Sequence, residues 1–102
     1  EVNPEIKQKR VGHACELETS MMLRIRPDLV RDLDKTAAVE FGNPFEPAAR
    51  GWITKDRTEV GHIGDPRFAT AEKGETIFSV FSADVVSLLN RVLAWDGKSW
   101  DG

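Results

Sequence analysis

The apolar residues of one segment near the start of the chain recur at the spacing of one helix face. Good helix formers surround these apolar positions, which are Leu17, Met21, Met22 and Ile25. Pro27 disfavours helical conformation at the residue before it, so we expect this helix to end near residue 26. Pro27 and Asp28 suit a further short turn of helix. The pattern therefore predicts one short amphipathic helix over residues 16–25.

A longer amphipathic pattern occupies the segment from about residue 70 to residue 96. Thr70 and Glu72 supply an N-cap and an acidic first turn, and Gly97 is a natural stop. One stripe of this helix is formed by Ile77, Phe81, Val85, Leu88, Val92 and Trp95. A stripe this wide must pack against a larger apolar surface than the other predicted elements offer. We expect the chain to dock on a sheet that further sequence or another chain supplies.

The remaining segments have neither a helical nor a strand period. Residues 1–12 are polar, and we expect a linker or a frayed terminal segment there. Residues 35–66 scatter apolar residues among glycine and proline, which predicts a long irregular loop with one or two short strands. Loops of this length are uncommon in compact domains unless they bind or cover something. We treat residues 13–102 as one unit that does not fold independently.

Composition and charge narrow the class of protein. The chain of 102 residues has room for one modest core. Its formal net charge of −3 provides no basic face for nucleic acid. No uninterrupted run of about 18 apolar residues occurs, so we expect no membrane partner. The single cysteine cannot form an internal disulfide, which favours a reducing, cytoplasmic setting.

The densest cluster of reactive side chains lies at the start of the first predicted helix. Residues 12–20 contain an imidazole, a thiol, two carboxylates and two hydroxyl groups. His13 and Glu16 are three residues apart, so on a helical turn they would share a face. This arrangement suits Glu16 as a metal ligand beside His13 as a general acid or base. The simpler interpretation is a helix N-terminus whose acidic residues complement the dipole, because His-x-x-Glu is a weak pattern.

Two ordered segments of the sequence resemble the creatininase (creatinine amidohydrolase) family. The stretch His13-Ala-Cys-Glu-Leu-Glu-Thr-Ser-Met-Met-Leu resembles the family form His-Ala-Gly-Glu-x-Glu-Thr-Ser-x-Met-Leu. Pro-Asp-Leu-Val follows here, where the family has Pro, then Asp or Glu, then Leu-Val. Gly64-Asp-Pro and then Ala69-Thr-Ala-Glu-Lys-Gly are similar to the segment before the family's C-terminal helix. The resemblance implies the α/β fold class. This chain would be the C-terminal part of a three-layer α/β/α fold, with mainly helices plus a long loop in this segment.

The resemblance also implies an enzyme, a metal-dependent hydrolase of a small cyclic substrate that cleaves a C–N bond other than a peptide bond. The implied cofactor is a divalent metal, zinc or manganese or both. His13 matches the family's catalytic histidine, and Glu16 matches a glutamate that faces the metal centre in many members. Creatininase itself has an apolar residue at the latter position, and acidic substrate-contacting residues where this chain has Arg10 and Gly12. Creatinine is therefore not the expected substrate.

Five further residues are assigned supporting roles. Glu18, Thr19 and Ser20 match the family's Glu-Thr-Ser, for which we expect hydrogen bonds that fix the histidine-bearing turn. His62 and Trp52 are candidate substrate contacts on the long loop. The simpler interpretation is a surface histidine for His62, and for Trp52 it is an anchor that holds the loop to the core.

The family's main metal ligands lie in a Gly-x-x-Glu-x-His segment, a following aspartate and a Gly-His-Gly-Gly-Asn turn, and none of these occurs here. We therefore expect the enzyme to be incomplete without the N-terminal portion of the same protein or a companion chain. A homo-oligomer is also expected, as in the relatives. The alternatives are a ring-opening hydrolase of an oxidised inositol (3-dehydro-scyllo-inosose type) and a non-catalytic interaction module. A third is an enzyme with Cys15 as nucleophile, although a small packing residue is the simpler interpretation there.

Overall fold

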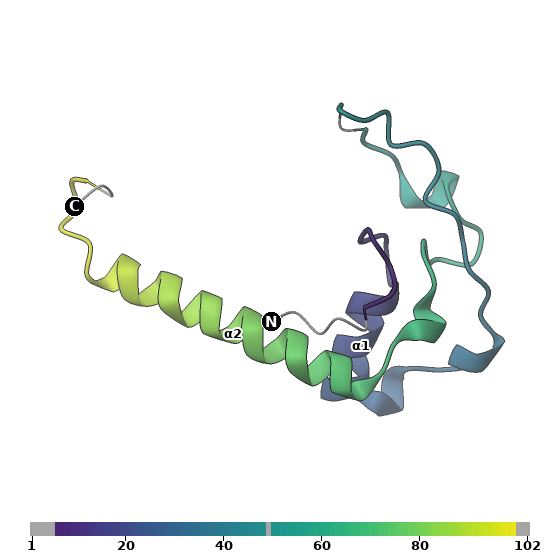
Figure 1. Ribbon diagram of the computed structural model, residues 1–102, viewed down its shortest axis with the longest axis horizontal. Helices are drawn as coiled ribbons and strands as arrows, with labels where there is room; N and C mark the ends of the chain where they lie inside the picture. Colours follow the sequence, from purple (N-terminus) through teal and green to yellow (C-terminus); the bar gives the residue numbers. More distant parts are fainter. Residues whose placement is uncertain (1–5, 49, 100–102) are drawn as a thin grey trace.

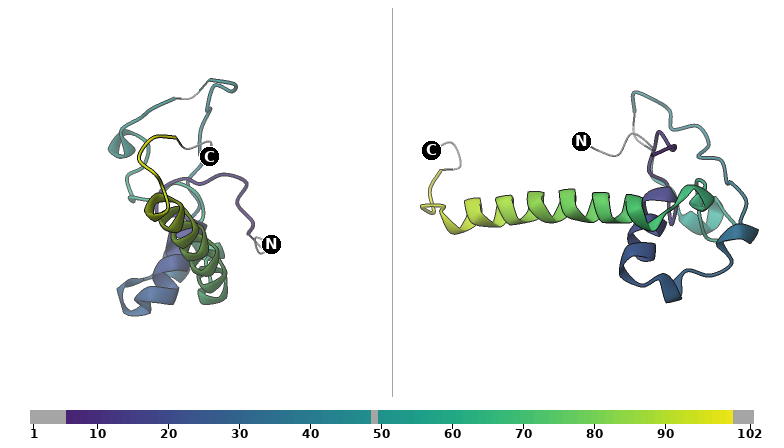
Figure 2. Two further views of the ribbon diagram at one scale, coloured as in Figure 1. Left: turned by 90° about the vertical axis from the view of Figure 1, so that its left-hand side faces the viewer. Right: turned by 60° about the horizontal axis from the view of Figure 1, so that its bottom comes forward.

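Two helices and a long connecting segment make up the part of the chain that the structure describes (Figure 1). The structure is a computed structural model that describes residues 6–48 and 50–99. The helices and short 3-10 turns in these residues are α1 (Glu16–Ile25), η1 (Pro27–Leu29), η2 (Leu33–Lys35), η3 (Thr54–Asp56), η4 (Pro66–Phe68) and α2 (Ala71–Leu93). Helix α1 packs against the N-terminal end of α2, and the rest of α2 extends away from the other elements (Figures 1 and 2).

Helix α1 has the predicted bounds, and the residues at its two ends explain them. At its N-terminus the Glu18 carboxylate accepts a hydrogen bond from the Cys15 amide at 3.2 Å. At its C-terminus the Arg26 amide donates to the Met22 carbonyl at 2.7 Å. Pro27 follows and begins the short turn η1, as predicted.

Helix α2 begins at the predicted cap. The Thr70 hydroxyl accepts a hydrogen bond from the Lys73 amide at 3.2 Å, and Glu72 makes the first turn acidic. The helix ends at Leu93, before the predicted stop at Gly97, whose φ of 83° is in the left-handed region. Apolar periodicity, Pro27 and the cap at Thr70 therefore predicted the bounds of α1 and the start of α2.

The two helices approach each other closely at a glycine. A Cβ atom added to Gly74 would lie 1.9 Å from the Ser20 carbonyl oxygen, a distance that no side chain tolerates. Ser20 and Gly74 are both buried at this crossing, and Ile77 is buried one turn further along α2. The absence of a side chain at Gly74 thus sets the spacing between α1 and α2.

The long loop contains isolated bridges instead of strands. His13 pairs with Ile63, and Val39 pairs with Gly64, both in antiparallel geometry. No β-strand occurs in residues 6–48 or 50–99, so the described chain is mostly helical with irregular connections. The predicted short strands in the loop are reduced to single bridges. The three-layer α/β/α fold is likewise not seen in this segment by itself.

The core is small and contains as many polar as apolar residues. The buried apolar residues among those described, glycines aside, are Cys15, Ile63, Pro66, Ala69 and Ile77. The buried polar and charged residues are Glu16, Ser20, His62, Asp65 and Lys73. Buried polar groups of this kind are stable only when they bond one another, so their hydrogen bonds define the fold here.

Most of helix α2 has no cover within the described residues. Beyond its first three turns, the apolar residues remain 45–84% exposed, namely Phe81, Val85, Val86, Leu88, Leu89, Val92 and Leu93. The radius of gyration is 17.1 Å, whereas a compact domain of about 100 residues has about 13 Å. Exposed apolar surface of this extent marks an interaction surface.

By length and composition only, helix α2 is long and apolar enough to cross a membrane. An 18-residue window in Ala71–Leu93 has a mean hydropathy of 1.4, and 6% of that window is buried. Polar residues interrupt the apolar run of this helix, but its many strongly apolar residues keep the mean hydropathy of the window high. One such helix is weak evidence for a membrane span, since core helices of soluble proteins can be as long and as apolar. The absence of a membrane partner remains a prediction.

Candidate functional site

The backbone of His13 is fixed in an extended conformation ahead of helix α1. Its amide donates to the Ile63 carbonyl at 3.0 Å, and the Ile63 amide donates back to the His13 carbonyl at 2.8 Å. The neighbouring Gly12 allows this approach, because a Cβ there would lie 2.0 Å from the Ile63 oxygen. The imidazole itself is exposed. The structure thus presents an exposed side chain on a fixed backbone.

A left-handed residue separates His13 from the helix. Ala14 has φ of 46°, and the helix begins only at Glu16. His13 therefore does not lie on a helical turn, and the prediction that it shares a helix face with Glu16 is wrong. The two side chains have different surroundings, with that of His13 exposed and that of Glu16 buried.

The turn that carries His13 is held by its neighbours in sequence. The Glu18 carboxylate accepts hydrogen bonds from the Cys15 amide at 3.2 Å and the Cys15 thiol at 3.0 Å. The Thr19 hydroxyl donates to the Ala14 carbonyl at 3.2 Å. Burial would raise the pKa of Glu18, but the hydrogen bonds from Cys15 and the nearby His13 outweigh it and hold the pKa below its usual value. Glu18 and Thr19 therefore stabilise both sides of the turn.

Ser20 connects the two helices. Its hydroxyl donates to the Glu16 carbonyl at 2.6 Å and accepts a hydrogen bond from the Thr70 amide at 3.2 Å. The residue is fully buried. The cap of α2 is therefore anchored on α1 through Ser20.

Glu16 lies in the polar core with both carboxylate oxygens bonded. Oε1 accepts a hydrogen bond from the Lys73 ammonium at 2.6 Å. Oε2 accepts from the Lys7 and Gln8 amides at 2.9 and 2.8 Å. Burial would raise the pKa of Glu16, but the Lys73 hydrogen bond and the two amides lower it below its ordinary value. The structure therefore places Glu16 in the polar core, bonded to Lys73, Lys7 and Gln8, and its assignment as a metal ligand stays a prediction.

The segment before His13 is more ordered than a linker. Residues 1–5 of the predicted linker lie outside the described residues. Lys7 and Gln8 are bound to the Glu16 carboxylate through their backbone amides. This part of the chain therefore belongs to the polar core.

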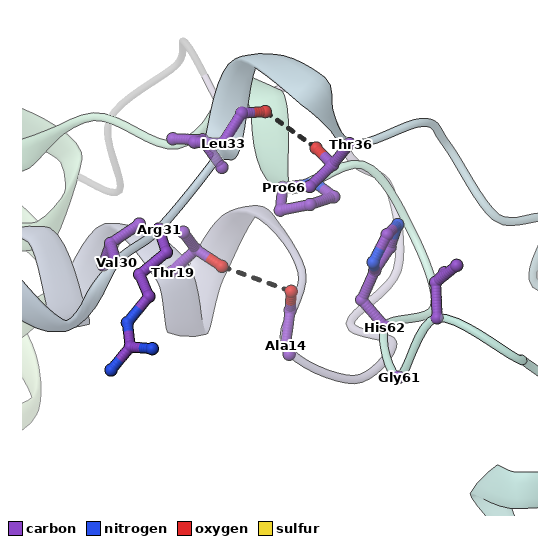
Figure 3. A pocket seen from close by; sticks show the side chains of 10 residues that line it. Ala14, Thr19, Val30, Arg31, Leu33, Thr36, Gly61, His62 and Pro66 are labelled. Carbon is purple, nitrogen blue, oxygen red and sulfur yellow. Dashed lines mark hydrogen bonds between the residues drawn. The ribbon is translucent and has the colours of Figure 1, made fainter.

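A hollow of about 300 Å³ adjoins the His13 turn (Figure 3). It is open to solvent and is lined by Ala14, Thr19, Val30, Arg31, Leu33, Thr36, Val60, Gly61, His62 and Pro66. Figure 3 shows Thr19 and Ala14 on one side and the Gly61–His62 loop on the other. The hollow lies between the turn that carries His13 and the long loop, and Ala14, the residue after His13, forms part of its wall.

The structure separates the two candidate substrate contacts. His62 lines the hollow and is 7% exposed, and its Nε2 donates to the Ala37 carbonyl at 2.6 Å. Trp52 does not line the hollow and is 44% exposed. The Arg57 guanidinium lies 5.6 Å from the centre of the Trp52 ring. His62 is therefore placed beside the His13 turn, whereas Trp52 packs within its own part of the loop.

The sequence of this chain matches a known protein family over most of its length. The family model described as Creatininase, creatinine amidohydrolase, matches residues 1–89 of the chain. The chain belongs to the creatininase family. No curated protein and no solved structure matches it. Membership suggests an amidohydrolase-type function and an α/β fold, and members of the family are generally metal-dependent.

The described residues of this creatininase-family chain do not fit a metal centre by themselves. No group of three or more histidine, cysteine, aspartate or glutamate residues is arranged to hold an ion in this part of the chain. The carboxylate oxygens of Glu16 are bonded to an ammonium and two amides, and Nε2 of His62 is bonded to a carbonyl. Zinc and manganese centres need three or four such ligands.

Sequence reasoning missed three members of the polar core. They are Gln8, Asp65 and Lys73. Lys73 occupies the third helical position after Thr70, where a capping box would have glutamate or glutamine. That departure is visible in the sequence. The pairing of Lys73 with Glu16 is not, because the two residues are 57 positions apart.

Proposed function

We propose that this creatininase-family chain supplies the proton-transfer histidine of a hydrolase. The substrate class is a small cyclic compound with an amide-like C–N bond other than a peptide bond. One observation carries the proposal: the family match includes His13, and the structure exposes this imidazole on a backbone fixed by two hydrogen bonds to Ile63. A group that is fixed at its backbone and accessible at its side chain suits proton transfer.

In this reaction His13 acts first as a base and then as an acid. It takes a proton from the attacking water, whose oxygen bonds to the carbonyl carbon. It then gives that proton to the leaving nitrogen as the C–N bond breaks. A positioned side chain of this kind contributes about 10²–10⁴-fold to the rate.

The hollow beside the His13 turn is the proposed place for the substrate. Its volume of about 300 Å³ lies at the lower end of the range for small-molecule sites, which is about 300–1,000 Å³. Thr19 and His62 provide polar groups at its wall. Because Trp52 lies outside this lining, we propose no substrate contact for it.

The metal implied by the family, zinc or manganese or both, would take its ligands from outside the described residues. We propose that the N-terminal portion of the same protein or a companion chain supplies them, in a cytoplasmic enzyme. The exposed apolar side of α2 supports a missing layer of this kind, because it needs a cover. The same surface also favours the second candidate function, a non-catalytic interaction module.

The turnover of the protein that carries this chain separates the two functions. A panel of small cyclic amides, with an oxidised inositol for the ring-opening alternative, would identify a substrate. On that substrate we expect His13→Ala to lower kcat by about 10²–10⁴-fold. The exposed Lys55 offers a control, and Lys55→Met should leave kcat unchanged. Unchanged turnover in His13→Ala would remove the histidine from the mechanism, and a chain inactive on the whole panel would favour the interaction module.

A further inference from the structure

The side chain of Gln8 bonds three separate stretches of backbone. Its Oε1 accepts hydrogen bonds from the Glu16 amide at 3.1 Å and from the Asp65 amide at 2.7 Å. Its Nε2 donates to the Arg10 carbonyl at 3.2 Å. One primary amide thus joins the segment before His13, the start of helix α1 and the turn that begins at Asp65.

The two amides that Gln8 binds lie on either side of the His13 bridge. Glu16 follows the His13 turn directly in the sequence, and Asp65 follows Ile63, the residue that pairs with His13. A shared acceptor fixes the distance between these two backbones. Pro66, next to Asp65, lines the hollow, so the same bond also places one wall of the proposed site.

Gln8 is itself held in place by the polar core. Its backbone amide donates to the Glu16 carboxylate at 2.8 Å, and this carboxylate is also bonded to the Lys73 ammonium. Gly64 packs directly against the side chain, because a Cβ there would lie 2.8 Å from Nε2 of Gln8. A side chain with both ends bonded and a glycine against it has little freedom to move. This is not the environment of a surface glutamine in a linker.

We propose that Gln8 is a positioning residue for His13, an inference that rests on the proposed function. Gln8 keeps the His13 turn and the Asp65 turn at a fixed separation, and so sets the place of the imidazole relative to the hollow. Gln8 does not touch the reacting atoms. Its effect on the reaction passes through the backbone that carries His13, and small misplacements of a catalytic group cost rate steeply.

A double-mutant cycle on kcat in the protein that carries this chain tests the inference. Gln8→Met keeps the length of the side chain but removes all three hydrogen bonds, and we expect it to lower kcat about tenfold or more. In the His13→Ala background, the same substitution should change kcat by less than about twofold, because the group that Gln8 positions is gone. The neighbouring Lys9 is exposed, and Lys9→Met is the matched control. An equal loss from Gln8→Met in both backgrounds, or no loss in either, would overturn the inference.

Gln8→Glu keeps the inference testable if Gln8→Met does not fold. A carboxylate retains an oxygen for the Glu16 and Asp65 amides, and it replaces the bond to Arg10 by a contact between two acceptor oxygens. We expect its kcat to remain within about threefold of the unmodified protein. A loss of kcat as large in Gln8→Glu as in His13→Ala would contradict the positioning role. The two proposals fail separately, because an unchanged kcat in His13→Ala removes the proposed function, whereas a loss there without one in Gln8→Met removes only the role of Gln8.

Discussion

The ammonium group of Lys73 lies 2.6 Å from the Glu16 carboxylate, and the two side chains are only 5% and 1% exposed. Glu16 is the first residue of α1, and Lys73 is in the first turn of α2. The pair therefore joins the two helices at their N-terminal ends. The Lys73 ammonium also donates to the Phe68 carbonyl at 2.7 Å, so a second bond holds it in place. This ion pair is the centre of the polar core that supports the His13 turn.

Removal of one member of the pair should destabilise the protein strongly. Lys73→Met or Glu16→Gln leaves a buried group without its partner, which costs about 3–5 kcal/mol. The double variant should lose less free energy of unfolding than the sum of the two single losses. Urea unfolding measures all three, and Lys55→Met, at an exposed site, should stay within about 0.5 kcal/mol of the unmodified protein. Additive losses would show that the two groups do not interact.

The stability of the protein should depend on Glu16 at acid pH. Burial would raise the pKa of Glu16, but the Lys73 hydrogen bond and the Gln8 and Lys7 amides lower it below its ordinary value of 4.5. A lowered pKa in the folded state contributes stability above pH 4.5, which is lost as the pH falls through the folded value. We therefore expect the free energy of unfolding to fall below pH 4.5 and to fall less steeply in Glu16→Gln.

Chemical denaturation between pH 3 and pH 6, roughly the range over which carboxylates of this kind titrate, measures this slope. The exposed Glu59 provides a control, and Glu59→Gln should keep the slope of the unmodified protein. If the free energy of unfolding fell as steeply with acid pH in Glu16→Gln as in Glu59→Gln, the proposed contribution of Glu16 would be contradicted.

The close approach of the helices at Gly74 predicts a position-specific loss of stability. In an ordinary helix, alanine is more stable than glycine by about 1 kcal/mol. At Gly74 the added Cβ would lie 1.9 Å from the Ser20 carbonyl, so the helices must move apart. We expect Gly74→Ala to cost about 1–3 kcal/mol, measured as a lowered Tm. Gly51→Ala, where nothing lies within 4 Å, should leave the Tm nearly unchanged. An increase in Tm for Gly74→Ala would contradict the packing described.

Cys15 should resist alkylation in the folded protein. Its thiol is fully buried and donates to the Glu18 carboxylate at 3.0 Å. We expect iodoacetamide to modify it only after unfolding, as followed by mass spectrometry, with no loss of turnover in the native state. Rapid native alkylation together with loss of activity would support the alternative of an enzyme with Cys15 as nucleophile.

Local signals predicted the helices but not the polar core. The periodic apolar residues, Pro27 and Thr70 act over a few positions, so the bounds of α1 and the cap of α2 could be read from the sequence. The pairing of Glu16 with Lys73 is tertiary and has no local signature. The positive φ of Ala14 was also not visible, and it removes His13 from the helix on which the spacing argument placed it.

The metal content of a Glu16→Gln variant tests the central claim most directly, namely that the cation bound by Glu16 is the ammonium of Lys73. The variant and the unmodified protein that carries this chain would be saturated with manganese or zinc, freed of excess metal, and analysed for metal per chain by plasma mass spectrometry on the folded fraction. We predict the same metal content in both proteins, because the Glu16 carboxylate is already bonded to Lys73, Lys7 and Gln8. A loss of bound metal in Glu16→Gln would contradict the account and make Glu16 a metal ligand.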